Sequence, residues 1–143
     1  MLVKQLSVFL ENKPGRLLAA IDKLAESGID ISALSLADTA EFGILRLIVD
    51  DPEKAKLVLA ESGVVSRISD VIAVAMADTP GGAGAILKIL SENGFNIEYM
   101  YACVGKVSGK ALSLLRVERP ADADELLRGK GFAKVNPADI YRI

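Results

Sequence analysis

The stretch "FLENKPGRLLAAIDKLAESGIDI", residues 9–31, decides the fold because its pattern occurs a second time in the chain. Residues 75–97 read "AMADTPGGAGAILKILSENGFNI". An offset of 66 aligns the Pro-Gly pairs, the helical leucines and the glycine that follows each predicted helix. Because agreement over a turn, a helix and a helix end is typical of internal repetition, we interpret the chain as two copies of one unit. The expected domains are residues 1–69 and residues 70–143.

The elements of each copy can be predicted in order. The first copy predicts a strand up to Glu11, a helix whose first turn contains Pro14 and which ends at Gly28, a two-stranded hairpin, and a second helix with Asp51 as its N-cap. Helical spacing directs five residues of the first helix inward: Leu17, Leu18, Ile21, Leu24 and Ala25. The second copy repeats this order and closes with a strand over "DIYRI", residues 139–143.

This order is βαββαβ. It predicts an α+β protein made of two tandem ferredoxin-like units, with the helices on one face of antiparallel sheets. The end of the first copy leaves two alternatives open. Residues 64–68, "VVSRI", form a short strand of their own, or one long strand bridges both copies. Because an uncovered edge strand invites aggregation, we expect the edges to be paired and the protein to be a homodimer with two-fold symmetry.

Composition excludes several classes of function. The chain has no histidine and a single cysteine, Cys103, so neither a His-based catalytic site nor a His/Cys zinc site is expected. The net charge of −2, without a basic run, argues against nucleic acid as a partner. No apolar stretch approaches the roughly 20 residues of a membrane span. We therefore expect a cytoplasmic protein that is not an enzyme and that has no metal and no cofactor.

The Asn/Asp-x-Pro-Gly turn followed by "PGRLLAAIDKLAESGIDI" resembles the ACT domain, a small regulatory module of amino-acid biosynthetic enzymes and regulators. "DTPGGAGAILKILSENGFNI" is similar, although glycines at positions 81, 82 and 84 make the start of its helix more flexible. The resemblance covers nearly the whole chain. It implies a stand-alone regulatory or sensing protein that binds a small ligand, commonly an amino acid, at the interface between two such domains.

The residues of the two turns suit a zwitterionic ligand. A helix N-terminus offers unpaired amides to a carboxylate, and glycines allow the ligand to approach the backbone. Asp78 can pair with an ammonium, whereas Asn12 accepts a hydrogen bond more weakly, so the second copy is the better site on electrostatic grounds and an Asp78→Ala change is expected to abolish binding. The candidate ligand-binding residues are Asn12, Pro14, Gly15, Arg16, Leu17, Asp78, Thr79, Pro80, Gly81, Gly82 and Ala83.

Each of these features also has a structural interpretation. Asn12 and Asp78 are residue types that commonly cap helices, and glycines 81–84 can serve close packing of a helix on a strand. Tyr99 and Tyr101 share one face of a strand and suit a subunit interface. A dinucleotide site is disfavoured because position 87, where the third glycine of that motif would fall, is leucine. The alternative function is a protein–protein interaction module that binds no small ligand.

Overall fold

The computed structural model describes residues 1–39, 41–107, 109–132 and 135–141, and it divides into two compact units. The first unit comprises residues 4–69. The second unit comprises residues 70–143 together with residues 1–3.

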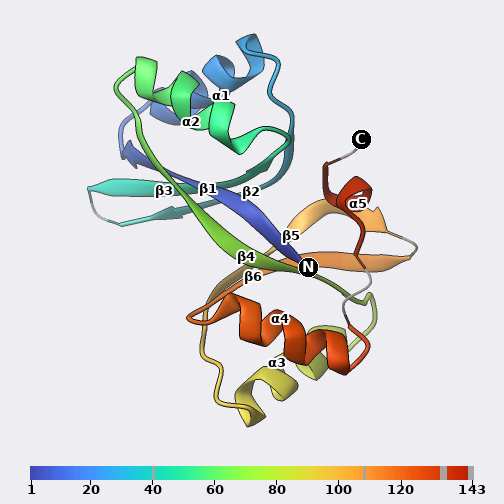
Figure 1. The fold of residues 1–143 in the computed structure, drawn as a ribbon. Helices are drawn as coiled ribbons and strands as arrows, with labels where there is room; N and C mark the ends of the chain where they lie inside the picture. Colours follow the sequence, from blue (N-terminus) through green and yellow to red (C-terminus); the bar gives the residue numbers. More distant parts are fainter. Residues whose placement is uncertain (40, 108, 133–134, 142–143) are drawn as a thin grey trace. The chain divides into compact units, whose positions relative to one another are not determined.

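The first unit has the ferredoxin-like order expected from the sequence. Its elements are β1 (Leu2–Glu11), α1 (Arg16–Glu26), β2 (Ile31–Asp38), β3 (Phe42–Val49), α2 (Pro52–Glu61) and the beginning of β4 (Val65–Ala77). The strands are hydrogen-bonded in the order β2-β3-β1-β4, and β3 is antiparallel to both β1 and β2. Helices α1 and α2 lie together on one face of these strands (Figure 1). The predicted fold class is therefore confirmed.

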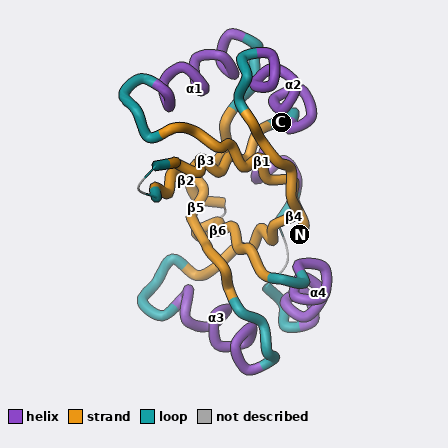
Figure 2. Tube along the Cα trace, turned by 90° about the vertical axis from the view of Figure 1, so that its left-hand side faces the viewer, coloured by secondary structure: helices purple, strands orange, loops and turns teal. Residues whose placement is uncertain are grey.

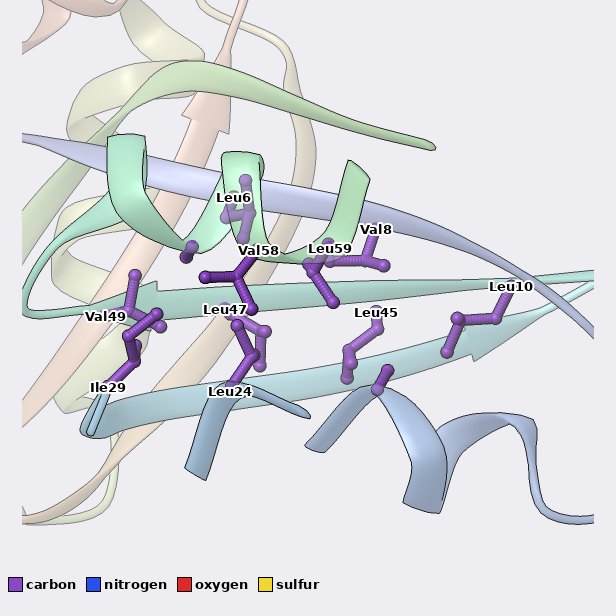
Figure 3. Packing of buried hydrophobic residues seen from close by; sticks show 12 residues of the cluster. Leu6, Val8, Leu10, Leu24, Ile29, Leu45, Leu47, Val49, Val58 and Leu59 are labelled. Carbon is purple, nitrogen blue, oxygen red and sulfur yellow. The ribbon is translucent and has the colours of Figure 1, made fainter. Parts of the chain in front are cut away.

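The core of the first unit lies between these helices and the sheet. Leu24 of α1 and Leu59 of α2 are fully buried and pack on the strand leucines, among them Leu47 (Figure 3). The inward face predicted for α1 is correct only in part. Leu17, Leu18 and Ala25 are exposed, whereas Ala20 is buried. The first turn of α1 therefore extends past the core and leaves its apolar side chains on the surface.

The start of α2 follows the sequence prediction. Asp51 is the N-cap, and its Oδ1 accepts a hydrogen bond from the Lys54 amide at 3.0 Å. Pro52 occupies the first helical position, where the missing N–H costs nothing. The helix ends ahead of Gly63, whose φ of 74° lies in the left-handed region that glycine adopts most readily.

Strand β4 settles the alternative that the sequence left open. It runs without interruption over the 13 residues Val65–Ala77. Residues 65–69 complete the first unit, and residues 70–77 provide the first strand of the second unit. One long strand therefore serves both copies, and residues 64–68 do not form a separate strand.

The second unit repeats most of this plan. Its further elements are α3 (Gly82–Glu92), β5 (Ile97–Val107), β6 (Lys110–Val117), α4 (Pro120–Gly129) and α5 (Pro137–Tyr141). The strand order is β4-β6-β5, with both pairings antiparallel. Helices α3 and α4 lie on one face of these strands (Figure 2). Their core consists of Ile72, Val74, Ile86, Leu90, Leu115, Val117, Ala123 and Leu127.

The predicted closing strand over residues 139–143 is wrong. Asp139, Ile140 and Tyr141 belong to helix α5, and residues 142–143 lie outside the described part of the chain. A helix start explains the difference, because the Asp139 carboxylate accepts a hydrogen bond from the Asn136 amide at 2.9 Å. The chain's own first residues lie beside β4 instead, where the Ala73 amide donates to the Met1 carbonyl at 2.8 Å.

Candidate functional site

The two Pro-Gly turns have nearly the same backbone geometry. Gly15 (φ 83°, ψ −11°) and Gly81 (φ 86°, ψ −5°) are left-handed N-caps of α1 and α3. The N-cap residue of each helix is the glycine itself, so neither Asn12 nor Asp78 occupies the N-cap position. Pro14 and the equivalent proline also lie before the helices rather than in their first turns. A left-handed glycine at each of these positions replaces the side-chain cap.

The first turn of α1 contains backbone amides that have no partner within the helix. The Arg16 amide donates to the Lys13 carbonyl at 3.3 Å, and the Ala19 amide donates to the Gly15 carbonyl at 3.0 Å. The amides of Leu17 and Leu18 fall between them, in the first helical turn, where no carbonyl lies four residues earlier within the helix. All of these residues are exposed. The turn therefore presents donors and the positive end of the helix dipole to a ligand.

Three charged side chains form an ion-pair network at this turn. The Glu11 carboxylate lies 3.0 Å from Lys13 Nζ and 3.6 Å from Arg16 Nη2. The hydrogen bond from Lys13 and its positive charge, with a smaller contribution from Arg16, lower the pKa of Glu11 below its ordinary value. Two cations against one carboxylate leave this network with a positive charge. It therefore favours an anionic group without excluding an ammonium at Glu11.

A hollow of ≈ 280 Å³ lies beside this network, within the first unit. Glu11 and Arg16 provide its charged wall, and Phe9 and Phe42 line it with aromatic surface. Phe9 is 42% exposed and Phe42 is 50% exposed, which is unusually open for side chains of this size. The remaining lining residues are Leu10, Ser62, Gly63, Val64 and Val65. The hollow thus combines an apolar floor with one residue of each charge, as small-molecule sites commonly do.

The second turn is built differently. Asp78 and the turn itself are exposed, but the gap behind α3 is apolar and too narrow to admit a water molecule. Gly82 packs against the end of β4 so closely that a Cβ there would lie 1.9 Å from the Ala77 carbonyl oxygen. The structural interpretation of the glycine cluster, close packing of helix on strand, therefore holds at Gly82.

The structure places the predicted site residues on two separate turns. Residues 12–17 lie on one exposed turn of the first unit, and residues 78–83 lie on the equivalent turn of the second. Sequence reasoning missed Phe9, Glu11 and Phe42, which line the hollow. Glu11 and Phe42 are cross-strand partners in the register of β1 with β3. The position of Glu11 directly before the turn was the one available signal, whereas the register required the structure.

The described residues support neither a metal site nor a membrane-spanning helix. In that part of the chain, no group of three His, Cys, Asp or Glu side chains is arranged to hold a metal ion. Every helix described is too short or too polar to cross a lipid bilayer.

The repeated fold, with a left-handed glycine turn before the first helix of each unit, defines a pair of small α+β modules. The chain belongs to the ACT domain family, because the family model described as an ACT domain pair matches residues 1–143. No curated protein matches the chain.

Solved structures agree with this assignment. Protein BT0572 from Bacteroides thetaiotaomicron superposes with a TM-score of 0.90 at 38% identity, covering 100% of this chain and 98% of that one. The ligand-free regulatory subunit of aspartate kinase from Thermus thermophilus superposes with a TM-score of 0.63 at 17% identity, covering 90% and 96% of the two chains. The equivalent subunit from Thermus flavus gives 0.61 at 17% identity, covering 90% and 94%. At that identity, the likeness to the Thermus subunits shows a shared fold.

Proposed function

We propose that this protein is a regulatory protein that binds a free amino acid and has no catalytic activity of its own. The observation that carries the proposal is the hollow beside the first turn, where Arg16 and Glu11 face an apolar floor. Membership of the ACT domain family supports the same role. So do the regulatory subunits that share the fold, although they support it more weakly. The cytoplasm, where the single thiol of Cys103 stays reduced, is the proposed location.

The chemistry of the hollow matches the two charges of an amino acid. The carboxylate would accept hydrogen bonds from Arg16 and from the first amides of α1, which the helix dipole strengthens. The ammonium would pair with Glu11, whose lowered pKa keeps it ionised throughout the neutral range. The volume of ≈ 280 Å³ lies just below the range of about 300–1,000 Å³ typical of sites for drug-sized ligands. A ligand as small as an amino acid is the best match in size.

A thermal-shift screen of the twenty amino acids tests the proposal. A ligand that binds only the folded state stabilises it by about 2.7 kcal/mol at a hundredfold excess over its dissociation constant. At least one amino acid is expected to raise the melting temperature in a concentration-dependent way, and isothermal titration calorimetry should confirm direct binding. If all twenty leave the melting temperature unchanged and give no heat of binding, the proposal is refuted.

The second candidate function is a protein–protein interaction module without a small ligand. One observation favours it: among the described residues, large exposed apolar side chains are concentrated in the first unit. They are Phe9, Leu17, Leu18, Leu34, Leu36, Phe42, Leu57 and Val65, against Met100 alone in the second unit. Exposed apolar surface commonly marks an interaction site. A negative amino-acid screen would leave this function as the better explanation of that surface.

We also propose that the protein is a homodimer. Strand β2 is at the edge of the sheet in the first unit, and its Leu34 and Leu36 are about half exposed. An apolar edge strand of eight residues is a ready template for pairing. Sedimentation velocity should show a dimer, and Leu36→Lys should shift it toward monomer, whereas Leu57→Lys on the surface of α2 should not. A monomer at micromolar concentration in the unmutated protein would refute the dimer.

Two expectations about interfaces stay predictions. The first is that the ligand lies at an interface between ACT units, and the second is that Tyr99 and Tyr101 of β5 contribute to a subunit interface. Thermodynamic linkage between ligand binding and dimerisation tests the expectation that the ligand lies at an interface. A ligand held between two copies must strengthen the dimer by the same factor by which dimerisation strengthens ligand binding.

A further inference from the structure

The two turns share a backbone but not a chemistry. At the offset of 66, Phe9 corresponds to Ala75, and Glu11 corresponds to Ala77. Arg16 corresponds to Gly82. Each substitution removes the functional part of the side chain: an aromatic ring, a carboxylate or a guanidinium. The second turn therefore lacks every charged group that lines the hollow of the first unit.

The strand register adds a fourth difference. Glu11 pairs with Phe42 across β1 and β3, and its counterpart Ala77 pairs with Lys110 across β4 and β6. Lys110 therefore occupies the position of Phe42 in the second unit. The aromatic floor of the first hollow is replaced by alanine on one strand and by a charged side chain on the other.

Packing explains why the second turn cannot hold an arginine. A Cβ at Gly82 would lie 1.9 Å from the Ala77 carbonyl oxygen, well inside contact distance, so any side chain there would push α3 away from β4. In the first unit Arg16 occupies the equivalent position, and its side chain is 57% exposed. The second turn gains close helix–strand packing in place of a ligand-binding group.

The hollow of the first unit also points to the class of ligand. Its floor is apolar, formed by Phe9 and Phe42 with Leu10 and residues 64–65, and Glu11 and Arg16 are its charged residues. If those two groups hold the ammonium and the carboxylate of an amino acid, apolar surface is left to the ligand's side chain. A charged side chain placed there would lose water without gaining a partner. A neighbouring hollow of ≈ 350 Å³, lined by residues 63–66 with Lys56 and Ala60, has no carboxylate and no aromatic residue.

We infer that each chain binds one amino acid, with an apolar side chain, at the first turn only, and that the second turn is a structural copy without a site. This inference rests on the proposed function and reverses the expectation that the second turn binds better. The guanidinium of Arg16 has five N–H donors, and its 3.6 Å pair with Glu11 involves Nη2, so it can hold a second carboxylate. Two of the test variants give the first turn the residues of the second: Arg16→Gly and Phe9→Ala.

Isothermal titration calorimetry on the full chain tests the inference, with leucine, isoleucine, valine, methionine and phenylalanine compared with glycine, aspartate and lysine. The expected stoichiometry is one per chain, with an apolar amino acid bound at least tenfold tighter than aspartate or lysine. Arg16→Gly should weaken binding at least tenfold, and Phe9→Ala should reduce the preference for apolar over small side chains. Lys88→Ala, which removes an exposed cation from α3, is the matched control and should bind as the unmutated chain does. Circular dichroism and thermal unfolding verify that each variant is folded.

The outcomes separate this inference from the proposed function. Binding of two ligands per chain, or tightest binding of a charged amino acid, would overturn the inference and leave amino-acid binding intact. So would binding that persists in Arg16→Gly and is lost in Asp78→Ala. Failure of the unmutated chain to bind any amino acid would overturn the proposed function itself.

Discussion

The carboxylate of Asp124 is 1% exposed and lies 2.5 Å from the α-amino nitrogen of Met1. Its other oxygen lies 2.7 Å from Nη2 of Arg128, one helical turn further along α4. A buried carboxylate between two cations is costly to disturb from one side only, because the partners keep their charges. Asp124→Asn keeps the shape and removes the charge. It is expected to destabilise the second unit by about 1–3 kcal/mol, the cost of removing one partner of a buried hydrogen bond, because the Arg128 side chain is 64% exposed and its charge can be solvated. Urea denaturation followed by circular dichroism measures the change.

The matched control for this substitution is Asp122→Asn on the same helix. Asp122 pairs with Arg119 at 3.4 Å, but both side chains are largely exposed. Exposed pairs contribute about 0–1 kcal/mol, so the control should differ little from the unmutated chain. Equal losses from the two substitutions would contradict the structural role of Asp124.

Alanine substitutions at Gly82 and Gly84 of α3 are expected to change the stability of the protein in opposite directions. Alanine at Gly82 would place its Cβ 1.9 Å from the Ala77 carbonyl oxygen, whereas a Cβ at Gly84 has nothing within 4 Å. We expect Gly82→Ala to destabilise by about 3 kcal/mol, at the upper end of the cost of overpacking. Gly84→Ala should stabilise by about 0.5–1 kcal/mol, because alanine loses less backbone entropy in a helix than glycine does. The midpoints of urea denaturation of the two variants should therefore move in opposite directions. A loss of stability at Gly84 would show that the space around it is not open.

Helix capping provides a contrast between two residues that look alike in the sequence. Asp51 accepts a hydrogen bond from the Lys54 amide, whereas Asn12 caps no helix. Asp51→Ala is expected to cost about 1 kcal/mol, the typical loss for an N-cap. Asn12→Ala should change the free energy of unfolding by less than about 0.5 kcal/mol, as surface substitutions usually do. Thermal unfolding of the two variants checks both values, and a larger loss at Asn12 would indicate a stabilising contact that the capping argument does not include.

Much of the fold could be predicted from the sequence. The repeat, the first five elements of each copy and the cap at Asp51 were predictable, because hydrophobic spacing and glycine or proline at element ends are local signals. The closing strand was not, because whether residues 139–143 can join β4 depends on what already occupies its edge. There the amide of Ala73 donates to Met1, far away in the sequence. Only the folded chain brings those residues together.

The candidate site also has a part that the sequence predicts and a part that only the structure reveals. The glycine turns and Arg16 were visible in the sequence, because a motif lies along the chain. Phe42 was not, since it reaches the hollow through the register of β3 with β1. Outside the candidate site, the burial of Asp124 was also missed, because helical spacing marks a position as inward-facing without showing which partner a charge will find there. Pairwise contacts between distant segments are therefore the part of the site that local patterns leave out.

The thiol of Cys103 is expected to react more slowly in the folded chain than in the unfolded chain. Burial raises its pKa from 9.0 to about 11, so at pH 8 its reactive thiolate is rarer in the folded chain than in the unfolded chain by about 100-fold. A thiolate of higher pKa is intrinsically more nucleophilic, which offsets part of this loss. We expect iodoacetamide to modify native Cys103 between about 10-fold and 100-fold more slowly than the same residue in urea, as followed by mass spectrometry. The sign of the pH dependence follows from the raised pKa: the native rate should keep rising with pH up to about 11, whereas the unfolded rate should level off near 9. A native rate that levels off near 9 would show that the thiol is in contact with water.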